Sequence, residues 1–129
     1  MKKFLFLPLL LITFISFSQE ASEIIGKPVK IGNLIVAEND FSESMDCKES
    51  IKACAELGKG WRLPTNSELK ILYANRKKIG NFSENNYWSS TKVPNAFFFV
   101  DFSNGKVGKI SVNEEFNESP SVRAVKFKN

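Results

Sequence analysis

Few residues in this sequence could carry out chemistry. The 129-residue chain has no histidine, and its two cysteines are Cys47 and Cys54. The lack of histidine removes the usual general base at neutral pH and the commonest transition-metal ligand. Seven helical residues would separate the two cysteines by about 10 Å, whereas bridged Cα atoms lie at most about 7 Å apart. Either the helix begins after Cys47 and a disulfide staples its first turns, or both thiols are free and face the core. We favour free, buried thiols.

Aromatic side chains offer a second kind of chemistry, because a sugar ring packs well against an exposed aromatic face. Trp61 lies between a glycine corner and a Leu-Pro pair, which favours core packing. Core packing is also favoured for Trp88. Tyr87 would point to the opposite face of the same predicted strand, so it is the better candidate for a ligand contact.

Basic residues offer a third kind of chemistry. If loops bring five cations together, they would bind a sulfated or carboxylated polysaccharide, with strong salt dependence. The favoured alternative is a solvated surface with ordinary lysines. The five cations are Arg76, Lys77, Lys78, Lys92 and Lys106.

The first 18 residues have the pattern of a secretory signal peptide. Two lysines precede an apolar run over 4–17, and small residues occur at 16 and 18, where a signal peptidase cuts. The run is shorter than the roughly 20 residues that span a bilayer. We therefore expect cleavage near Ser18 and a secreted or periplasmic protein without a transmembrane segment.

The charge of the chain argues against a nucleic-acid partner. The net charge is +4, and removal of the two lysines in residues 1–18 lowers it to +2. A nucleic-acid-binding domain would carry a dense basic face. We find only short basic clusters and expect no nucleic acid.

Local signals define the elements that must position these residues. We expect a flexible lead-in over 19–27 and one domain over 28–129. Gly32 and Asn33 between two apolar runs predict a β-hairpin. A helix is then predicted from an Asp46 cap to a Gly58 stop.

The stretch after this helix forms a corner. Pro64 keeps Leu63 out of the helical region, and Thr65 with Glu68 forms a capping box that opens a second helix. Arg62 is either solvated or turned inward, where it would donate to loop carbonyls and a carboxylate.

The second half of the chain predicts antiparallel strands. In the strongest one, Phe98, Val100 and Phe102 share the core side, whereas Phe97 and Phe99 lie on the other side and are expected to be covered by long loops. A final half-buried strand is predicted over 122–127. The order of elements predicts an α+β fold, with two helices packed on an irregular twisted antiparallel sheet.

Several motifs follow one another in order along the chain. They are Gly60-Trp61-Arg62-Leu63-Pro64-Thr65, Glu68-Leu69, Leu72-Tyr73, Ile79-Gly80, Phe82, Tyr87-Trp88-Ser89-Ser90-Thr91, Phe102-Ser103-Asn104-Gly105 and Val122-Arg123-Ala124-Val125. In these motifs the chain resembles a family of exported bacterial domains, typified by the C-terminal domain of the Legionella collagen-like protein, with the Fibrobacter major paralogous domain as a relative. The resemblance implies a C-type-lectin-like fold with paired terminal strands, and extracellular ligand binding or adhesion.

Two chemistries associated with this fold are not expected. Calcium-dependent lectins need an acid-Pro-Asn loop and a Trp-Asn-Asp strand, whereas this chain has Val93-Pro94-Asn95 and Trp88-Ser89-Ser90. Formylglycine-generating enzymes hold copper through two late thiols, and both cysteines here lie in the first predicted helix. We therefore expect no metal, no cofactor and no enzymatic activity.

The sequence thus predicts a non-catalytic exported domain that binds an extracellular carbohydrate or cell-surface protein without calcium. The alternative is a structural or assembly module of the cell envelope. By analogy with the fold, the predicted ligand-binding residues are Tyr87, Ser89, Lys92, Asn95 and Asn104. Structural roles are predicted for Trp61, Arg62, Leu63, Pro64, Thr65, Glu68 and Trp88.

Overall fold

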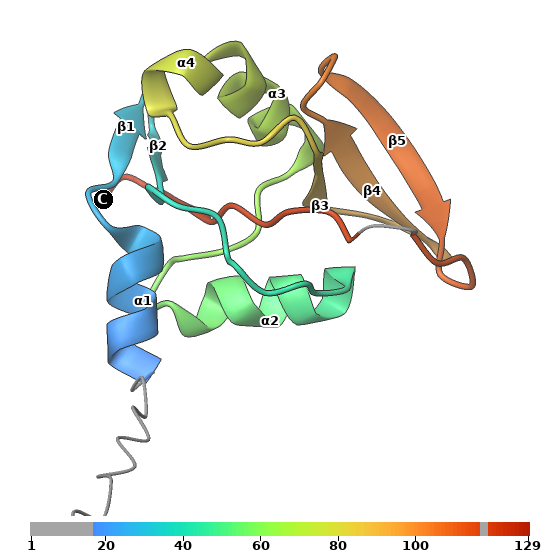
Figure 1. Cartoon of the computed structure of the whole chain (residues 1–129), viewed down its shortest axis with the longest axis horizontal. Helices are drawn as coiled ribbons and strands as arrows, with labels where there is room; N and C mark the ends of the chain where they lie inside the picture. The colour runs from blue at the N-terminus through green and yellow to red at the C-terminus, as the bar shows by residue number, and fades with distance from the viewer. Residues whose placement is uncertain (1–16, 117–118) are drawn as a thin grey trace, which may run out of the picture.

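Two small antiparallel sheets organise the protein (Figure 1). The structure, a computed structural model, describes residues 17–116 and 119–129. One sheet has the strand order β1-β2-β6 and the other β3-β4-β5. The described part of the chain also contains four helices, so the predicted α+β class is confirmed.

The helices and strands have the following bounds. The helices are α1 (Phe17–Ile25), α2 (Cys47–Glu56), α3 (Asn66–Ala74) and α4 (Arg76–Ile79). The strands are β1 (Val29–Ile31), β2 (Leu34–Val36), β3 (Asn86–Val93), β4 (Ala96–Asp101), β5 (Lys106–Ser111) and β6 (Val125–Phe127).

Helix α1 corrects the prediction of a flexible lead-in over 19–27. Ile24 is buried, and the main-chain N–H groups of Glu38 and Asn39 donate to carbonyls at the end of α1 at 3.0 and 3.1 Å. The apolar end of this segment packs into the core. The polar composition of the segment as a whole does not predict this packing. Residues 1–16, most of the predicted signal peptide, lie outside the described residues.

Local sequence signals place the first hairpin and α2 correctly. Gly32 has a φ of +57°, and the two-residue turn sets Ile31 opposite Leu34. The Glu49 N–H donates to the Asp46 side chain at 2.8 Å, which caps α2 as predicted. These are short-range interactions, so short-range patterns suffice to predict them.

The C-terminal segment differs from the predicted half-buried strand over 122–127. Strand β6 covers only Val125–Phe127 and pairs with β2, the second strand of the hairpin. Residues 122–125 are all buried, with no alternation. The segment runs through the core before it joins the sheet, so both of its sides are covered.

The β3-β4-β5 sheet carries buried residues on both faces. Val100 and Phe102 belong to one core cluster, together with residues of β2 and α3. Phe97 and Phe99 pack against a second cluster, which includes residues of α2 and the corner before α3. Phe97 and Phe99 are half-buried, so the prediction that they are covered is only partly confirmed, and Phe98, predicted on the core side, is also only half-buried.

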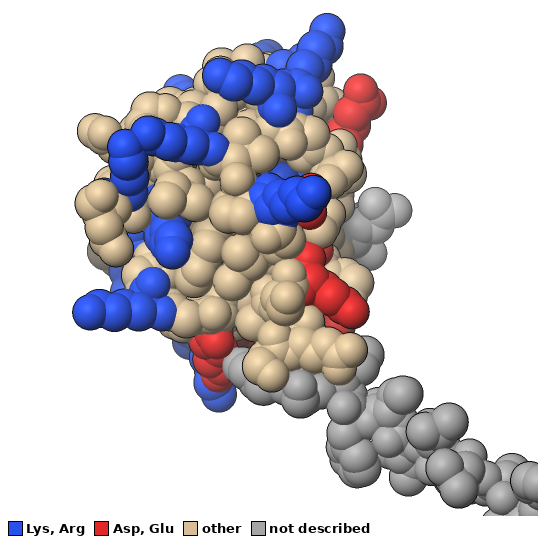
Figure 2. Space-filling view, turned by 90° about the vertical axis from the view of Figure 1, so that its left-hand side faces the viewer, with Lys and Arg blue, Asp and Glu red and all other residues tan. Residues whose placement is uncertain are grey.

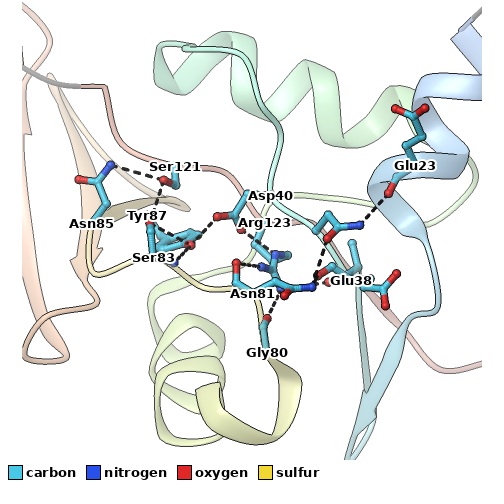
Figure 3. Close-up of polar contacts among 12 residues, drawn as sticks. Glu23, Glu38, Asp40, Gly80, Asn81, Ser83, Asn85, Tyr87, Ser121 and Arg123 are labelled. Carbon is cyan, nitrogen blue, oxygen red and sulfur yellow. Dashed lines mark hydrogen bonds and ion pairs between the residues drawn. The ribbon is translucent and has the colours of Figure 1, made fainter. Parts of the chain in front are cut away.

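A fully buried arginine joins distant parts of the chain (Figure 3). The Arg123 Nε donates to Asp40 Oδ1 at 2.7 Å. Its Nη1 donates to the carbonyls of Ala37 and Gly80 at 3.2 and 3.3 Å, and its Nη2 to that of Asn81 at 2.9 Å. The guanidinium thus holds the segment after β2 against the turn after α4.

Tyr87 belongs to the same buried network, and its predicted exposure is wrong. Its side chain is 0% exposed, and its hydroxyl donates to Asp40 Oδ2 at 2.6 Å (Figure 3). The same hydroxyl accepts from the Ser83 N–H at 2.9 Å. Burial raises the Tyr87 pKa above its ordinary value, and the Asp40 charge raises it further. Tyr87 is therefore a core residue.

Candidate functional site

A bulge in β3 shapes the site that the predicted ligand-binding residues point to. Trp88 lies opposite Phe99 and Lys92 opposite Phe97, so three residues, 89–91, face Phe98 alone. Inside the bulge, the main chain folds onto a serine side chain: the N–H of residue 91 donates to the Oγ of residue 89 at 3.1 Å. Bulges bend a strand and re-aim the side chains that follow.

The corner between α2 and α3 holds this bulge in place. The Ser90 N–H donates to the Pro64 carbonyl at 2.8 Å. The Asn66 N–H, at the start of α3, donates to Thr91 Oγ1 at 2.9 Å. The corner therefore supports β3 through the Pro64 carbonyl and the Asn66 N–H, and the Thr91 hydroxyl is the one side-chain group that takes part.

Arg62 stabilises the corner from the other side. Its guanidinium makes two hydrogen bonds with Glu68, at 2.6 and 2.7 Å, and lies over the Phe127 ring at 4.3 Å. Glu68 also completes the predicted capping box with Thr65. The Arg62 hydrogen bonds hold the Glu68 pKa below its ordinary value. Of the two predicted roles for Arg62, the donor to a carboxylate is observed, although its side chain is 31% exposed and its side-chain hydrogen bonds go to Glu68 rather than to loop carbonyls.

The start of α2 is attached to β3 next to the bulge. The Trp88 indole N–H donates to the Met45 carbonyl at 2.9 Å, and the Cys47 thiol donates to the Ser89 carbonyl at 3.5 Å. Trp88 is buried, as predicted. These two contacts fix the distance between the helix start and the sheet.

Both cysteines are free and buried, as favoured from the sequence. Burial, assisted by the Asp46 charge and opposed by Lys92, raises the pKa of Cys47 to about 11. Burial alone raises the pKa of Cys54 to about 12. Because the thiolate is the nucleophile, neither thiol is reactive at neutral pH.

A groove runs between the start of α2 and the β3-β4-β5 sheet; we call it the α2–sheet groove. It consists of two adjoining pockets of about 390 and 300 Å³. Cys47, Lys48, Phe97 and Val112 line both pockets. The larger, which we call the aromatic pocket, also has Trp88 and Phe116 in its wall. The smaller, which we call the bulge pocket, follows residues 89–93 of β3.

The bulge pocket brings together three of the five predicted ligand-binding residues. Ser89, Lys92 and Asn95 all line it. Ser89 is buried in its wall, whereas Lys92 and Asn95 are exposed at its mouth. Asn95 has a φ of +60°, in the tight turn from β3 to β4, where asparagine is among the tolerated residues.

The other two predicted residues do not belong to the groove. Tyr87 lies on the opposite face of β3 and is buried in the arginine network. Asn104 lies in the turn between β4 and β5, where its Oδ1 accepts from the Lys106 N–H at 2.9 Å. Asn104 therefore has a turn-forming role in this structure.

Lys48, Val112 and Phe116 line the groove but were not predicted from the sequence. Lys48 lies in the first turn of α2, and the only local sequence signal near it is the Asp46 cap, which marks the start of a helix and does not indicate a groove. Val112 is 44% exposed just after β5. Apolar residues beside an acidic loop are only a weak sequence signal of a binding groove, because the sequence does not show that the loop returns toward α2.

The basic residues do not all gather at the groove. Lys92 lines it, whereas Arg76 donates to the Tyr73 carbonyl at 2.9 Å and lies over the Tyr73 ring. Another group of lysines lies on the β1-β2-β6 sheet, where Lys30 and Lys128 are close enough that Lys128 lowers the Lys30 pKa. Figure 2 shows the side of the molecule that carries this sheet, with many Lys and Arg side chains on it.

The described residues lack two features, a metal-binding cluster and a membrane-spanning helix. Residues 17–116 and 119–129 contain no group of three or more acidic, histidine or cysteine side chains arranged to hold a metal ion. None of the helices in these ranges has the length and apolar character needed to cross a membrane.

Comparison with known proteins adds no assignment. The chain matches no protein-family model, and it has no significant match among curated protein sequences. The geometry of the groove and the sequence motifs are therefore the features that bear on function.

Proposed function

We propose that this protein is a non-catalytic, exported domain of the C-type-lectin-like class. In this proposal it binds an extracellular carbohydrate or cell-surface protein in the α2–sheet groove, without calcium. The observation that carries the proposal is the meeting of Ser89, Lys92 and Asn95 in one pocket. The sequence motifs that resemble the exported bacterial domains support the assignment of the fold class.

The bulge pocket has the side chains that recognise a polar ligand with an apolar face. An amide and an ammonium group lie at its mouth, beside the exposed Val93. Such pockets combine apolar contact with a few polar groups that orient the ligand. Lys92 and Lys48 would also attract a carboxylated or sulfated ligand.

The same pocket offers poor groups for catalysis. Its titratable side chains are two lysines and the Cys47 thiol, whose pKa is raised to about 11. General acid–base catalysis works best with a group whose pKa lies near the working pH. The bulge hydroxyls of Ser89 and Thr91 accept hydrogen bonds from main-chain N–H groups and hold the bulge. Binding without turnover is therefore the function that the geometry favours.

A glycan array probed at low and high salt tests this proposal. Lys92→Gln removes the charge at the mouth of the bulge pocket, and Lys106→Gln is the matched control, because Lys106 is an exposed strand lysine that does not line this pocket. We expect binding to a subset of acidic glycans that weakens in high salt, falls with Lys92→Gln and persists with Lys106→Gln.

Two outcomes would contradict the proposal. If the Lys92→Gln and Lys106→Gln variants bind glycans equally well, the ligand binds outside the groove. A lack of glycan binding, together with stable co-purification of a cell-envelope protein that survives Lys92→Gln, would favour the assembly module instead.

A further inference from the structure

The aromatic pocket differs in chemistry from the bulge pocket beside it. Trp88, Phe97 and Phe116 line its wall. The Trp88 ring meets that of Phe97 at 77° with centroids 6.2 Å apart, and that of Phe116 at 79° with centroids 5.2 Å apart. Aromatic rings at near right angles therefore form a corner of the pocket.

Two of these rings, those of Trp88 and Phe116, make further contacts outside the pocket. The Trp88 indole is fixed by its hydrogen bond to the Met45 carbonyl at 2.9 Å. Phe116 also meets Phe99 edge-on, with centroids 5.1 Å apart. A rigid aromatic corner needs little ordering when a ligand arrives, which favours binding.

The rim of the aromatic pocket is acidic. Asp46, Glu114 and Glu115 line the pocket, against the single cation Lys48. All four residues are exposed. Three carboxylates and one ammonium leave a negative balance beside the aromatic wall, whereas the bulge pocket has cations and no carboxylate in its lining.

We propose that the aromatic pocket binds an alkylated ammonium group, such as the quaternary ammonium of a choline-like headgroup. The faces of aromatic rings carry negative charge and attract cations, and walls of aromatic rings recognise quaternary ammonium groups. Methyl groups on the nitrogen fill an apolar corner, and the carboxylates of the rim offset the charge without a direct hydrogen bond. The volume of about 390 Å³ accommodates such a group.

This inference rests on the proposed function, because it names a chemical group that one half of the same groove receives. It also separates the two halves by charge, with a cation in the aromatic pocket and a polar or anionic group in the bulge pocket. Lys48 lines both pockets, so it lies at the boundary between the half proposed to bind a cation and the half proposed to bind a polar or anionic group.

Titration with choline and with its uncharged isostere 3,3-dimethyl-1-butanol tests the inference. The intrinsic tryptophan fluorescence reports binding, since Trp88 lines the pocket. The two probes have the same shape, so their difference in affinity measures the charge. We expect choline to bind about 2- to 30-fold more tightly, the range of a cation on aromatic faces.

Two variants and a control locate the site. Glu114→Gln combined with Glu115→Gln removes rim charge and should weaken choline binding by roughly threefold to fivefold at low salt, with no effect on the isostere. Phe116→Leu removes one aromatic wall and should weaken choline binding more than isostere binding. Glu84→Gln, an exposed carboxylate that does not line the pocket, should change neither affinity.

The inference would be overturned by equal affinities for choline and its isostere, or by choline binding that the rim and Phe116 variants leave unchanged. The results also separate this inference from the proposed function. A positive glycan array with no preference for choline would overturn only the inference. Choline binding in the aromatic pocket, together with a negative array and envelope-protein binding that Lys92→Gln leaves intact, would overturn only the proposed function.

Discussion

Replacement of Arg123 by methionine should destabilise the protein severely while leaving the groove residues untouched. The arginine is 0% exposed and satisfies one carboxylate and three main-chain carbonyls. Methionine fills much of the same space but has no donor. The variant would therefore leave the Asp40 carboxylate, whose side chain is only 20% exposed, without its ion pair.

The expected cost is about 3–5 kcal/mol, the usual range for removing one partner of a buried ion pair. Small proteins are stable by only about 5–15 kcal/mol, so the loss is a large fraction of the total. Urea unfolding followed by tryptophan fluorescence measures it, because Trp61 and Trp88 are both buried. Arg76→Met is a matched control, since Arg76 also lies over an aromatic ring but is partly exposed; it should cost less than about 1 kcal/mol.

The pH dependence gives a second test. Burial raises the Asp40 pKa above its ordinary value, although Arg123 and Tyr87 oppose this effect. Without Arg123, the pKa should rise further. A carboxyl whose pKa is raised by folding contributes most stability below its unfolded pKa and loses that contribution as the pH rises through its folded pKa. The difference in stability between Arg123→Met and the unmodified protein should thus be smaller near pH 4 than at pH 7.

A double-mutant cycle identifies the source of the loss. Combining Arg123→Met with Asp40→Asn removes both charges, so the double variant should recover about 1–3 kcal/mol relative to the sum of the single changes. Additive effects, or a loss below about 1 kcal/mol for Arg123→Met alone, would refute the view that this buried pair holds the two segments together.

Three further outcomes follow from the structure. Glu68→Gln should cost about 1–2 kcal/mol at pH 7 in urea unfolding, because it weakens a charge-assisted pair with Arg62. Since folding lowers the Glu68 pKa, this contribution is present above the unfolded pKa and is lost as the pH falls through the folded pKa, so a deficit that grows in acid would contradict the assignment. Cys47 and Cys54 should resist a thiol reagent at pH 8 in the native protein and both react in denaturant; fast reaction of either native thiol would show that the burial is incorrect. Gly108→Ala should lower the melting temperature, because a Cβ there would collide with the Phe99 ring on the next strand, and an unchanged melting temperature would show that this ring moves freely.

The parts of the fold that the sequence predicts are the local ones. Asp46 and Thr65 cap their helices through residues three positions away. The Gly32 turn joins two adjacent strands. Each signal and its effect lie within a few residues, so neither depends on how the rest of the chain folds.

The buried network was missed because its partners are distant in sequence. Arg123 and Asp40 are 83 residues apart, and Arg123 was predicted only as part of a half-buried strand over 122–127. The same alternation correctly set Tyr87 and Trp88 on opposite faces of β3. It failed for the exposure of Tyr87 because the β3-β4-β5 sheet is covered on both faces.

The candidate site was predicted only in part, because some of its residues are also distant from one another in sequence. Ser89, Lys92 and Asn95 were selected by analogy with the fold, and all three line the bulge pocket, although the bulge itself was not predicted. Lys48 and Phe116 belong to other segments, and only the tertiary arrangement places them in the same groove. A single sequence carries no signal that joins a helix start to a distant loop.

The bonds between the corner and the bulge have a consequence for how this protein can change over evolutionary time. They use the Pro64 carbonyl, the N–H groups of Asn66 and Ser90, and one hydroxyl. None of them uses the side chains of Lys92 and Val93, which are exposed at the mouth of the bulge pocket. Mutations at these two positions can therefore accumulate at little cost in stability, whereas Asn95 is constrained by its positive φ, so the scaffold can acquire new ligands without losing the contacts that hold the bulge.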